Sequence, residues 1–98
     1  MTEFTVKNIK GTSKSRYNVP SEYNSWLDYY KSNAKNRTKK CHTIGCSNDI
    51  EVGAHVIIEG QREWYIVPLC KSCNKKKNSF TVKSPLVPVN LTEYKILK

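Results

Sequence analysis

Apolar residues recur at every third or fourth position between residues 22 and 35, the spacing of one face of an α-helix: Tyr23, Trp26, Leu27 and Tyr30. We therefore predict an amphipathic helix from Glu22 to Lys35. Ser21 stands just before this segment and suits the N-cap position. The simplest interpretation of the apolar stripe is a helix face that packs on the hydrophobic core.

A different pattern predicts strands in three other segments. Residues 4–10 alternate weakly between apolar and polar side chains, and we expect a short edge strand there. Residues 51–59 and 63–67 are rich in β-branched and aromatic side chains, which favour strands. Residues 60–62 begin with a glycine and are typical of the turn of a hairpin.

The last part of the chain has fewer regular features. Residues 74–80 are predicted to form a short helix. Residues 84–97 are interrupted by Pro85 and Pro88, so we expect this segment to be extended. The predicted elements together indicate a small α+β protein, and a length of 98 residues allows one domain.

The strongest chemical signal is a set of four cysteines in two close pairs, Cys41/Cys46 and Cys70/Cys73. Two short chelating loops of this kind supply the four thiolates of a tetrahedral metal site, and Zn²⁺ is its most common occupant, with iron as the alternative. Gly45 can relieve the tight turn inside the first pair. His42 and His55 are possible substitute ligands, but four cysteines already complete a structural site. We therefore expect one structural zinc per chain.

The surroundings of the cysteines agree with metal binding rather than disulfide formation. The first ten residues have no apolar stretch typical of a signal peptide, and no long apolar segment predicts a membrane span. We therefore expect a cytoplasmic protein, and paired cysteines in a reducing compartment are typical of metal sites.

The chain is strongly basic, with 17 lysines and arginines against 8 acids and a formal net charge of +9. Ligation of one Zn²⁺ by four thiolates would leave about +7. Such a charge favours polyanionic partners, with nucleic acid first, acidic protein surfaces second and anionic membranes third. No small-molecule substrate is evident from the sequence.

Basic residues cluster beside both cysteine pairs, and a metal that joins the pairs would bring the two clusters together. The alternative interpretation of each cluster is an ordinary solvated segment. Joined into one face, they would form a phosphate-binding surface. The predicted nucleic-acid-binding residues are Lys35, Arg37, Lys39, Lys40, Lys71, Lys75, Lys76 and Lys77.

The order of a cysteine knuckle, a β-hairpin and a second cysteine pair at a helix start describes a treble clef. Cys41-x4-Cys46, then Ala54-His55, then Cys70-x2-Cys73-Asn74 resembles the zinc-stabilised HNH nuclease domains of the ββα-metal class, over about residues 41–80. The resemblance implies that His55 is the general base and that Asn74 binds a catalytic Mg²⁺ or Mn²⁺.

Several positions depart from the pattern of that family. Ala54 stands where an acid or a second histidine often precedes the base, and the predicted second strand has no asparagine to orient it. Asn74 is a neutral ligand, whereas catalytic Mg²⁺ prefers charged oxygen donors. The catalytic set is therefore interpreted as incomplete.

We expect a treble clef over residues 41–83, preceded by the amphipathic helix and basic connector of residues 1–40 and followed by an extended tail at 84–98. The leading hypothesis is a non-catalytic module that binds nucleic acid, DNA ahead of RNA, through its lysine-rich face. One alternative is an active metal-dependent endonuclease that uses His55 and Asn74. A second is a small regulator or inhibitor that binds a protein partner.

Overall fold

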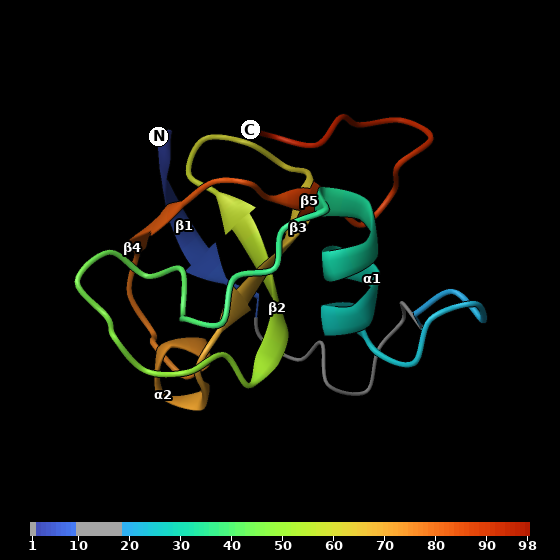
Figure 1. The fold of residues 1–98 in the computed structure, drawn as a ribbon. Coiled ribbons are helices and arrows are strands. Elements are labelled where there is room, and N and C mark those ends of the chain that lie inside the picture. Colours follow the sequence, from blue (N-terminus) through green and yellow to red (C-terminus); the bar gives the residue numbers. More distant parts are fainter. Residues whose placement is uncertain (1, 10–18) are drawn as a thin grey trace.

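A five-stranded antiparallel sheet forms the centre of the computed structural model, which describes residues 2–9 and 19–98 (Figure 1). The strand order is β4-β1-β2-β3-β5, and two helices accompany the sheet. The elements in chain order are β1 (Glu3–Asn8), α1 (Trp26–Ala34), β2 (Val52–Ile58), β3 (Trp64–Leu69), α2 (Lys71–Asn74), β4 (Phe80–Lys83) and β5 (Val87–Pro88). The α+β class expected from the sequence is confirmed.

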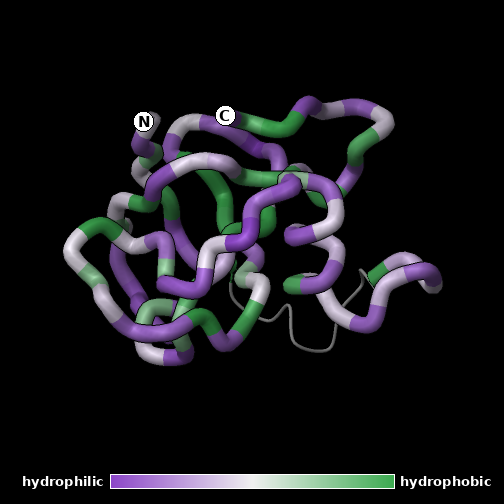
Figure 2. The backbone as a smooth tube through the Cα atoms, viewed as in Figure 1, coloured by the Kyte–Doolittle hydropathy of each residue, from purple (hydrophilic) through white to green (hydrophobic). Residues whose placement is uncertain are grey.

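The β2–β3 hairpin divides the interior into two clusters because successive side chains of a strand point to opposite faces. Ala54, Val56 and Ile58 of β2 belong to a cluster that also contains buried cysteines. Ile66 of β3 belongs to a second cluster, with Tyr29 and Tyr30 of α1. Figure 2 shows that the hairpin strands are rich in hydrophobic residues, whereas the segment after α1 is mainly hydrophilic.

Helix α1 begins at Trp26, four residues later than predicted, and its N-cap is Ser25 rather than Ser21. The Ser25 hydroxyl accepts a hydrogen bond from the backbone N–H of Asp28 at 3.1 Å, which satisfies one of the free donors of the first turn. Residues 21 and 22 form a turn instead, where the N–H of Tyr23 donates to Pro20. The helix ends where Lys35 adopts a left-handed conformation with φ of 53°.

Strand β1 lies inside the sheet, between β4 and β2, so the prediction of an edge strand was wrong. The predicted strand ran to Lys10, which lies outside the described residues, whereas β1 ends at Asn8. The neighbour that covers β1 is β4, a strand that the sequence did not predict.

The helix predicted at residues 74–80 was also misplaced, because α2 spans Lys71–Asn74 and Phe80 starts β4. A side chain from β1 helps to end this helix. The Asn8 amide donates to the carbonyls of Cys73 at 3.0 Å and Lys76 at 3.1 Å. In a longer helix these carbonyls would accept from backbone N–H groups of the following turn, so the side chain of Asn8 takes the place of that turn.

The C-terminal segment packs along α1 and is held there by two tyrosine hydroxyls. Tyr29 donates to the carbonyl of Pro88, and Tyr30 donates to the carbonyl of Pro85, each at 2.7 Å. Leu86 and Leu97 exchange two backbone hydrogen bonds of 2.9 Å, so the end of the chain folds back on itself. The expected extended tail thus contains β5 and a bridge.

We expect Gly53→Ala to destabilise the protein by about 1–3 kcal/mol because it overpacks the contact between β2 and α1. A Cβ at Gly53 would lie 2.6 Å from the backbone nitrogen of Leu27 and 2.7 Å from the carbonyl carbon of Trp26, so α1 must move. Urea unfolding measures the loss, and tryptophan emission reports the displacement.

Gly60→Ala is the control for this substitution. Gly60 has a positive φ of 85° but open space around it, so alanine there strains the turn and leaves α1 in place. An unchanged urea midpoint and unchanged emission for Gly53→Ala would contradict the tight contact.

Candidate metal centre and basic face

The four cysteines converge at one point, as the sequence predicted. Cys41 and Cys46 lie in the loop before β2, Cys70 directly follows β3, and Cys73 lies in α2. Their four Sγ atoms are all within 4.8 Å of one another, and Cys46 and Cys70 are 3.9 Å apart. A tetrahedral site with metal–sulfur bonds of about 2.3 Å has sulfur–sulfur edges of about 3.8 Å. The cluster therefore can hold a metal ion.

Backbone hydrogen bonds shape the first ligand loop. The N–H of Cys46 donates to Thr43 at 3.0 Å, and the N–H of Cys41 donates to Asn48 at 2.9 Å. Gly45 takes a positive φ of 83°, which allows the turn between the two thiols. The N–H of Ile44 donates to the carbonyl of Thr81 in β4, so this loop is anchored to the sheet.

The second ligand loop starts a helix. Cys70 is the N-cap of α2, and its Sγ lies 3.5 Å from the N–H of Cys73 and 3.6 Å from the amide of Asn48. Burial alone would raise the pKa of the Cys70 thiol, but these hydrogen bonds outweigh it and lower the pKa to about 6. Burial raises the pKa of Cys73 to about 12. A bound cation would stabilise the thiolate form of all four cysteines.

His42 is a structural residue whose importance the sequence did not reveal. Its Nδ1 lies 2.9 Å from the carbonyl of Lys83, and its Nε2 lies 3.3 Å from the amide of Asn36. A neutral ring that donates from Nδ1 and accepts at Nε2 satisfies both contacts. Burial lowers the pKa of His42 to about 4, which favours this neutral form. His42 thus joins the segment after α1 to the end of β4 and does not belong to the metal cluster.

The two predicted catalytic residues have different surroundings. His55 of β2 points toward α1, where its ring makes edge contacts with Trp26 at 5.0 Å and Trp64 at 6.3 Å. Its Nε2 is buried without a hydrogen-bond partner in the described part of the chain, and burial lowers its pKa. Asn74 is exposed at the end of α2, and the neighbouring Cys73 packs in the other core cluster. The described contacts thus do not bring His55 and Asn74 together.

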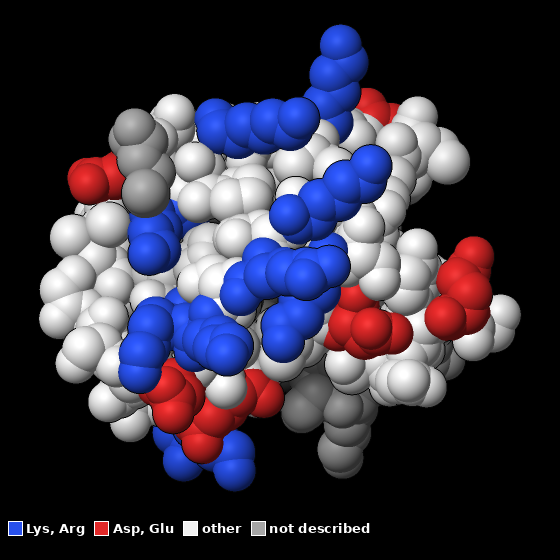
Figure 3. Space-filling model, viewed as in Figure 1, with Lys and Arg blue, Asp and Glu red and all other residues white. Residues whose placement is uncertain are grey.

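The predicted basic residues are all exposed. Three of them, Lys35, Arg37 and Lys39, line a cavity of about 710 Å³ after α1. Lys31 of α1 lines the same cavity, together with hydroxyl and amide groups. No acidic residue of the described chain lines this cavity. Figure 3 shows basic side chains in a band across this face, from the end of α1 toward the cysteine loop and α2.

Acidic side chains interrupt the band near the metal cluster. Lys40 forms an ion pair of 2.6 Å with Asp49, and Glu51 accepts a hydrogen bond of 2.7 Å from the N–H of Lys71. Lys40 is therefore partly neutralised. Positive charge on this face is therefore concentrated at the cavity beside α1. The sequence did not distinguish this part of the face from the part near the metal cluster.

No known protein family, curated protein or solved structure matches this chain. Among the described residues, no helix is both long and apolar enough to cross a membrane.

We expect the chain to bind one divalent metal ion per molecule, and Cys70→Ser to abolish this binding. Coordination free energy is folding free energy in a site of this kind, so metal removal should also abolish the cooperative thermal transition. Cobalt absorption and native mass spectrometry measure coordination and stoichiometry. Ser72→Ala, an exposed position between two ligands, is the control. A metal-free protein with an unchanged thermal transition would contradict the expected role.

Proposed function

We propose that the protein is a structural-zinc module, with a treble-clef arrangement of its ligand loops, that binds nucleic acid without cleaving it. The thiol cluster supports zinc, because four sulfur ligands at near-tetrahedral spacing form a closed site that leaves no position for substrate. The chain order supports the treble clef, since a tight turn at Gly45, the β2–β3 hairpin and a helix that begins at the second pair follow one another.

The observation that carries the nucleic-acid proposal is the cavity beside α1. Four cationic side chains surround it, and the hydroxyl groups of Ser32 and Thr38 line the same space. Phosphate contacts from lysine, arginine and hydroxyl groups supply most of the affinity for a nucleic acid backbone. A cavity of this composition therefore suits a phosphate chain, and the segment that follows α2 adds the exposed Lys75, Lys76 and Lys77.

We propose DNA rather than RNA as the preferred ligand, and the proposal does not include sequence-specific recognition. Base readout needs side chains held on a rigid element that enters a groove. Helix α2 has only four residues, and the cavity lies mainly in the irregular segment after α1. This surface can therefore bind the phosphate backbone of a nucleic acid electrostatically.

Catalysis is left out of the proposal because the residues that the HNH resemblance implies lack the surroundings of a hydrolytic site. The ring of His55 packs against Trp26 and Trp64, and burial lowers its pKa. A general base must reach the water that it activates, and a catalytic metal needs oxygen ligands close to that base. The described contacts of Asn74 do not provide this arrangement.

We expect nucleic acid binding to weaken steeply with salt, and the doubly substituted Arg37→Gln, Lys39→Gln protein to lose two phosphate contacts. The slope of log K against log salt concentration should then fall by about 1.8 on duplex DNA. Fluorescence anisotropy at several salt concentrations measures the slope. The matched control, Lys95→Gln with Lys98→Gln, removes two exposed charges outside the cavity. Equal slopes for the two variants would contradict the assignment of this cavity.

We expect no cleavage of plasmid DNA or RNA in the presence of Mg²⁺ or Mn²⁺. The comparison is between the natural protein and His55→Gln, which keeps a polar side chain of similar size. Gel analysis of supercoiled plasmid detects single nicks. Metal-dependent cleavage that disappears in His55→Gln would favour the endonuclease alternative instead.

A further inference from the structure

Two adjoining pockets form a groove that differs in chemistry from the basic face. The first, of about 250 Å³, lies beside the β2–β3 turn and includes Glu63, Trp64, Glu93 and Tyr94 in its lining. The second, of about 530 Å³, lies against the start of α1. Val89 and Asn90 line both pockets, so the two spaces adjoin at the segment after β5. We call this surface the acidic aromatic groove.

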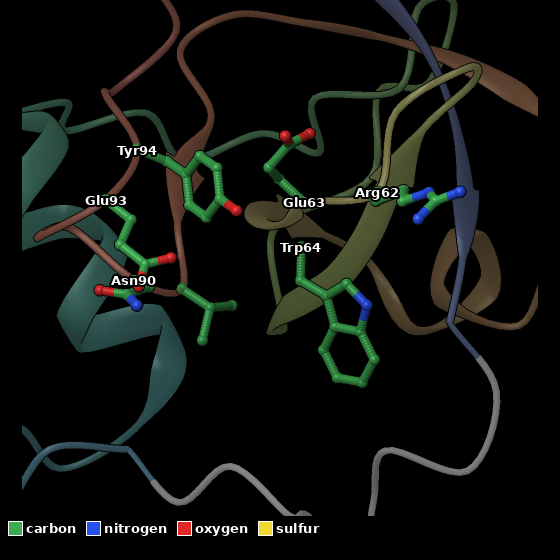
Figure 4. A pocket seen from close by; sticks show the side chains of 7 residues that line it. Arg62, Glu63, Trp64, Asn90, Glu93 and Tyr94 are labelled. Atoms are coloured by element: carbon green, nitrogen blue, oxygen red, sulfur yellow. The ribbon is translucent and has the colours of Figure 1, made fainter.

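The first pocket of the groove faces away from the basic band. Figure 4 looks at the first pocket with α1 on the left and β1 on the right, whereas Figure 1 has α1 on the right and β1 on the left. The first pocket therefore opens on the side of the molecule that is hidden in Figure 3. A ligand of the groove and a nucleic acid on the basic face would occupy different surfaces.

The first pocket has the composition of a site for a cationic side chain. The ring of Tyr94 and the indole of Trp64 lie on different sides of it, and the carboxylates of Glu63 and Glu93 lie at its edge (Figure 4). Arg62 also lines the pocket, but its guanidinium extends away from both carboxylates (Figure 4). Aromatic faces and carboxylates both attract a guanidinium or ammonium group.

The second pocket suits an apolar side chain. Tyr23, Trp26 and Tyr29 form its wall, with Tyr29 in edge contact with the other two rings at 5.3 and 5.0 Å. Leu91 also lines this pocket and is 39% exposed, one of few large apolar side chains with this exposure in the described chain. Tyr94 in the first pocket is 37% exposed. Large apolar groups that remain in water beside a hollow are typical of a binding surface.

The distribution of charge indicates what kind of partner fits. Basic residues outnumber acidic ones by 17 to 8 in the whole chain, yet the groove is lined by three acids, Glu22, Glu63 and Glu93, and by Arg62 as its one base among the described residues. The excess of acidic side chains in the groove repels a nucleic acid and attracts a cation. It separates the groove from the basic face in function as well as in position.

We propose that the acidic aromatic groove binds a short segment of a partner protein that carries an arginine or lysine next to an apolar side chain. The cationic group enters the pocket between Tyr94 and Trp64, and the apolar side chain packs against Trp26 and Tyr29. A peptide suits the two pockets because one is lined by carboxylates and aromatic rings and the other mainly by apolar side chains, so that neighbouring side chains of different chemistry can enter each. The inference is independent of the proposed nucleic acid binding.

The test is an NMR titration of the full metal-loaded chain with synthetic peptides. The probes are capped peptides that contain one arginine and one leucine, separated by zero to three glycines, and the same peptides with glutamate in place of arginine. We expect the arginine series alone to shift the resonances of Tyr94, Leu91 and the tryptophan side chains. The best spacer identifies the distance between the two subsites.

Three variants sharpen the test. Glu63→Gln combined with Glu93→Gln, and separately Tyr94→Ala, should weaken binding of the arginine peptide about tenfold, equivalent to roughly 1.4 kcal/mol. Glu59→Gln, an exposed acid near the same hairpin turn but outside both pockets, should bind normally, and DNA binding should not change in any of them. Because Tyr94 and both glutamates are surface residues, thermal unfolding can verify that the variants fold.

Three results would overturn the proposal. The glutamate peptides could bind as well as the arginine peptides, or neither series could shift the groove residues. Sedimentation could also reveal self-association that Tyr94→Ala abolishes, which would identify the occupant as a second copy of this chain.

Discussion

The alternation of side chains along the β2–β3 hairpin is the constraint on which the other parts of the structure depend. One face of β2 contributes Ala54 and Val56 to the cluster that contains the cysteines, and the other face presents Gly53 and His55 to α1. A shift of one residue in the pairing would exchange these faces. The thiol cluster and the helix contact therefore fix the register together, from opposite sides of the same two strands.

This arrangement also separates the chemistry of the molecule into surfaces. The thiols are mainly buried beneath the ligand loops, the lysines and Arg37 beside α1 are exposed, and the first pocket of the acidic aromatic groove opens on the other side. His42 holds the segment after α1 to β4 through Asn36 and Lys83, so the basic cavity is built on a backbone that the core positions. The small scaffold thus carries a cavity lined by basic side chains and, elsewhere, two pockets lined mainly by acidic and aromatic ones.

Local sequence patterns predicted the parts of the fold that depend on neighbours in the chain. The β-branched runs marked β2 and β3, and the cysteine pairs marked the one cluster in which four thiols meet. Features that depend on distant residues were missed. Ser21 and Ser25 are both good caps, and only the turn at Pro20 selects the second. Three such features join residues more than 30 positions apart in the sequence: the pairing of β1 with β4, the hydrogen bonds from Asn8 at the end of α2 and the contact of His42 with Lys83.

The pairing of β1 with β4 has a consequence for how the chain acquires its fold. Glu3 lies opposite Lys83, so the two partners are separated by almost the whole sequence, whereas the hairpin and its cysteines are close in sequence and lie between them. During synthesis the hairpin and the ligand loops can form before β4, the second partner of β1, has been made. Strand β1 gains β4 as a neighbour only after residue 83 has left the ribosome, and the exposed edge of β1 stays open to pairing with other chains until then.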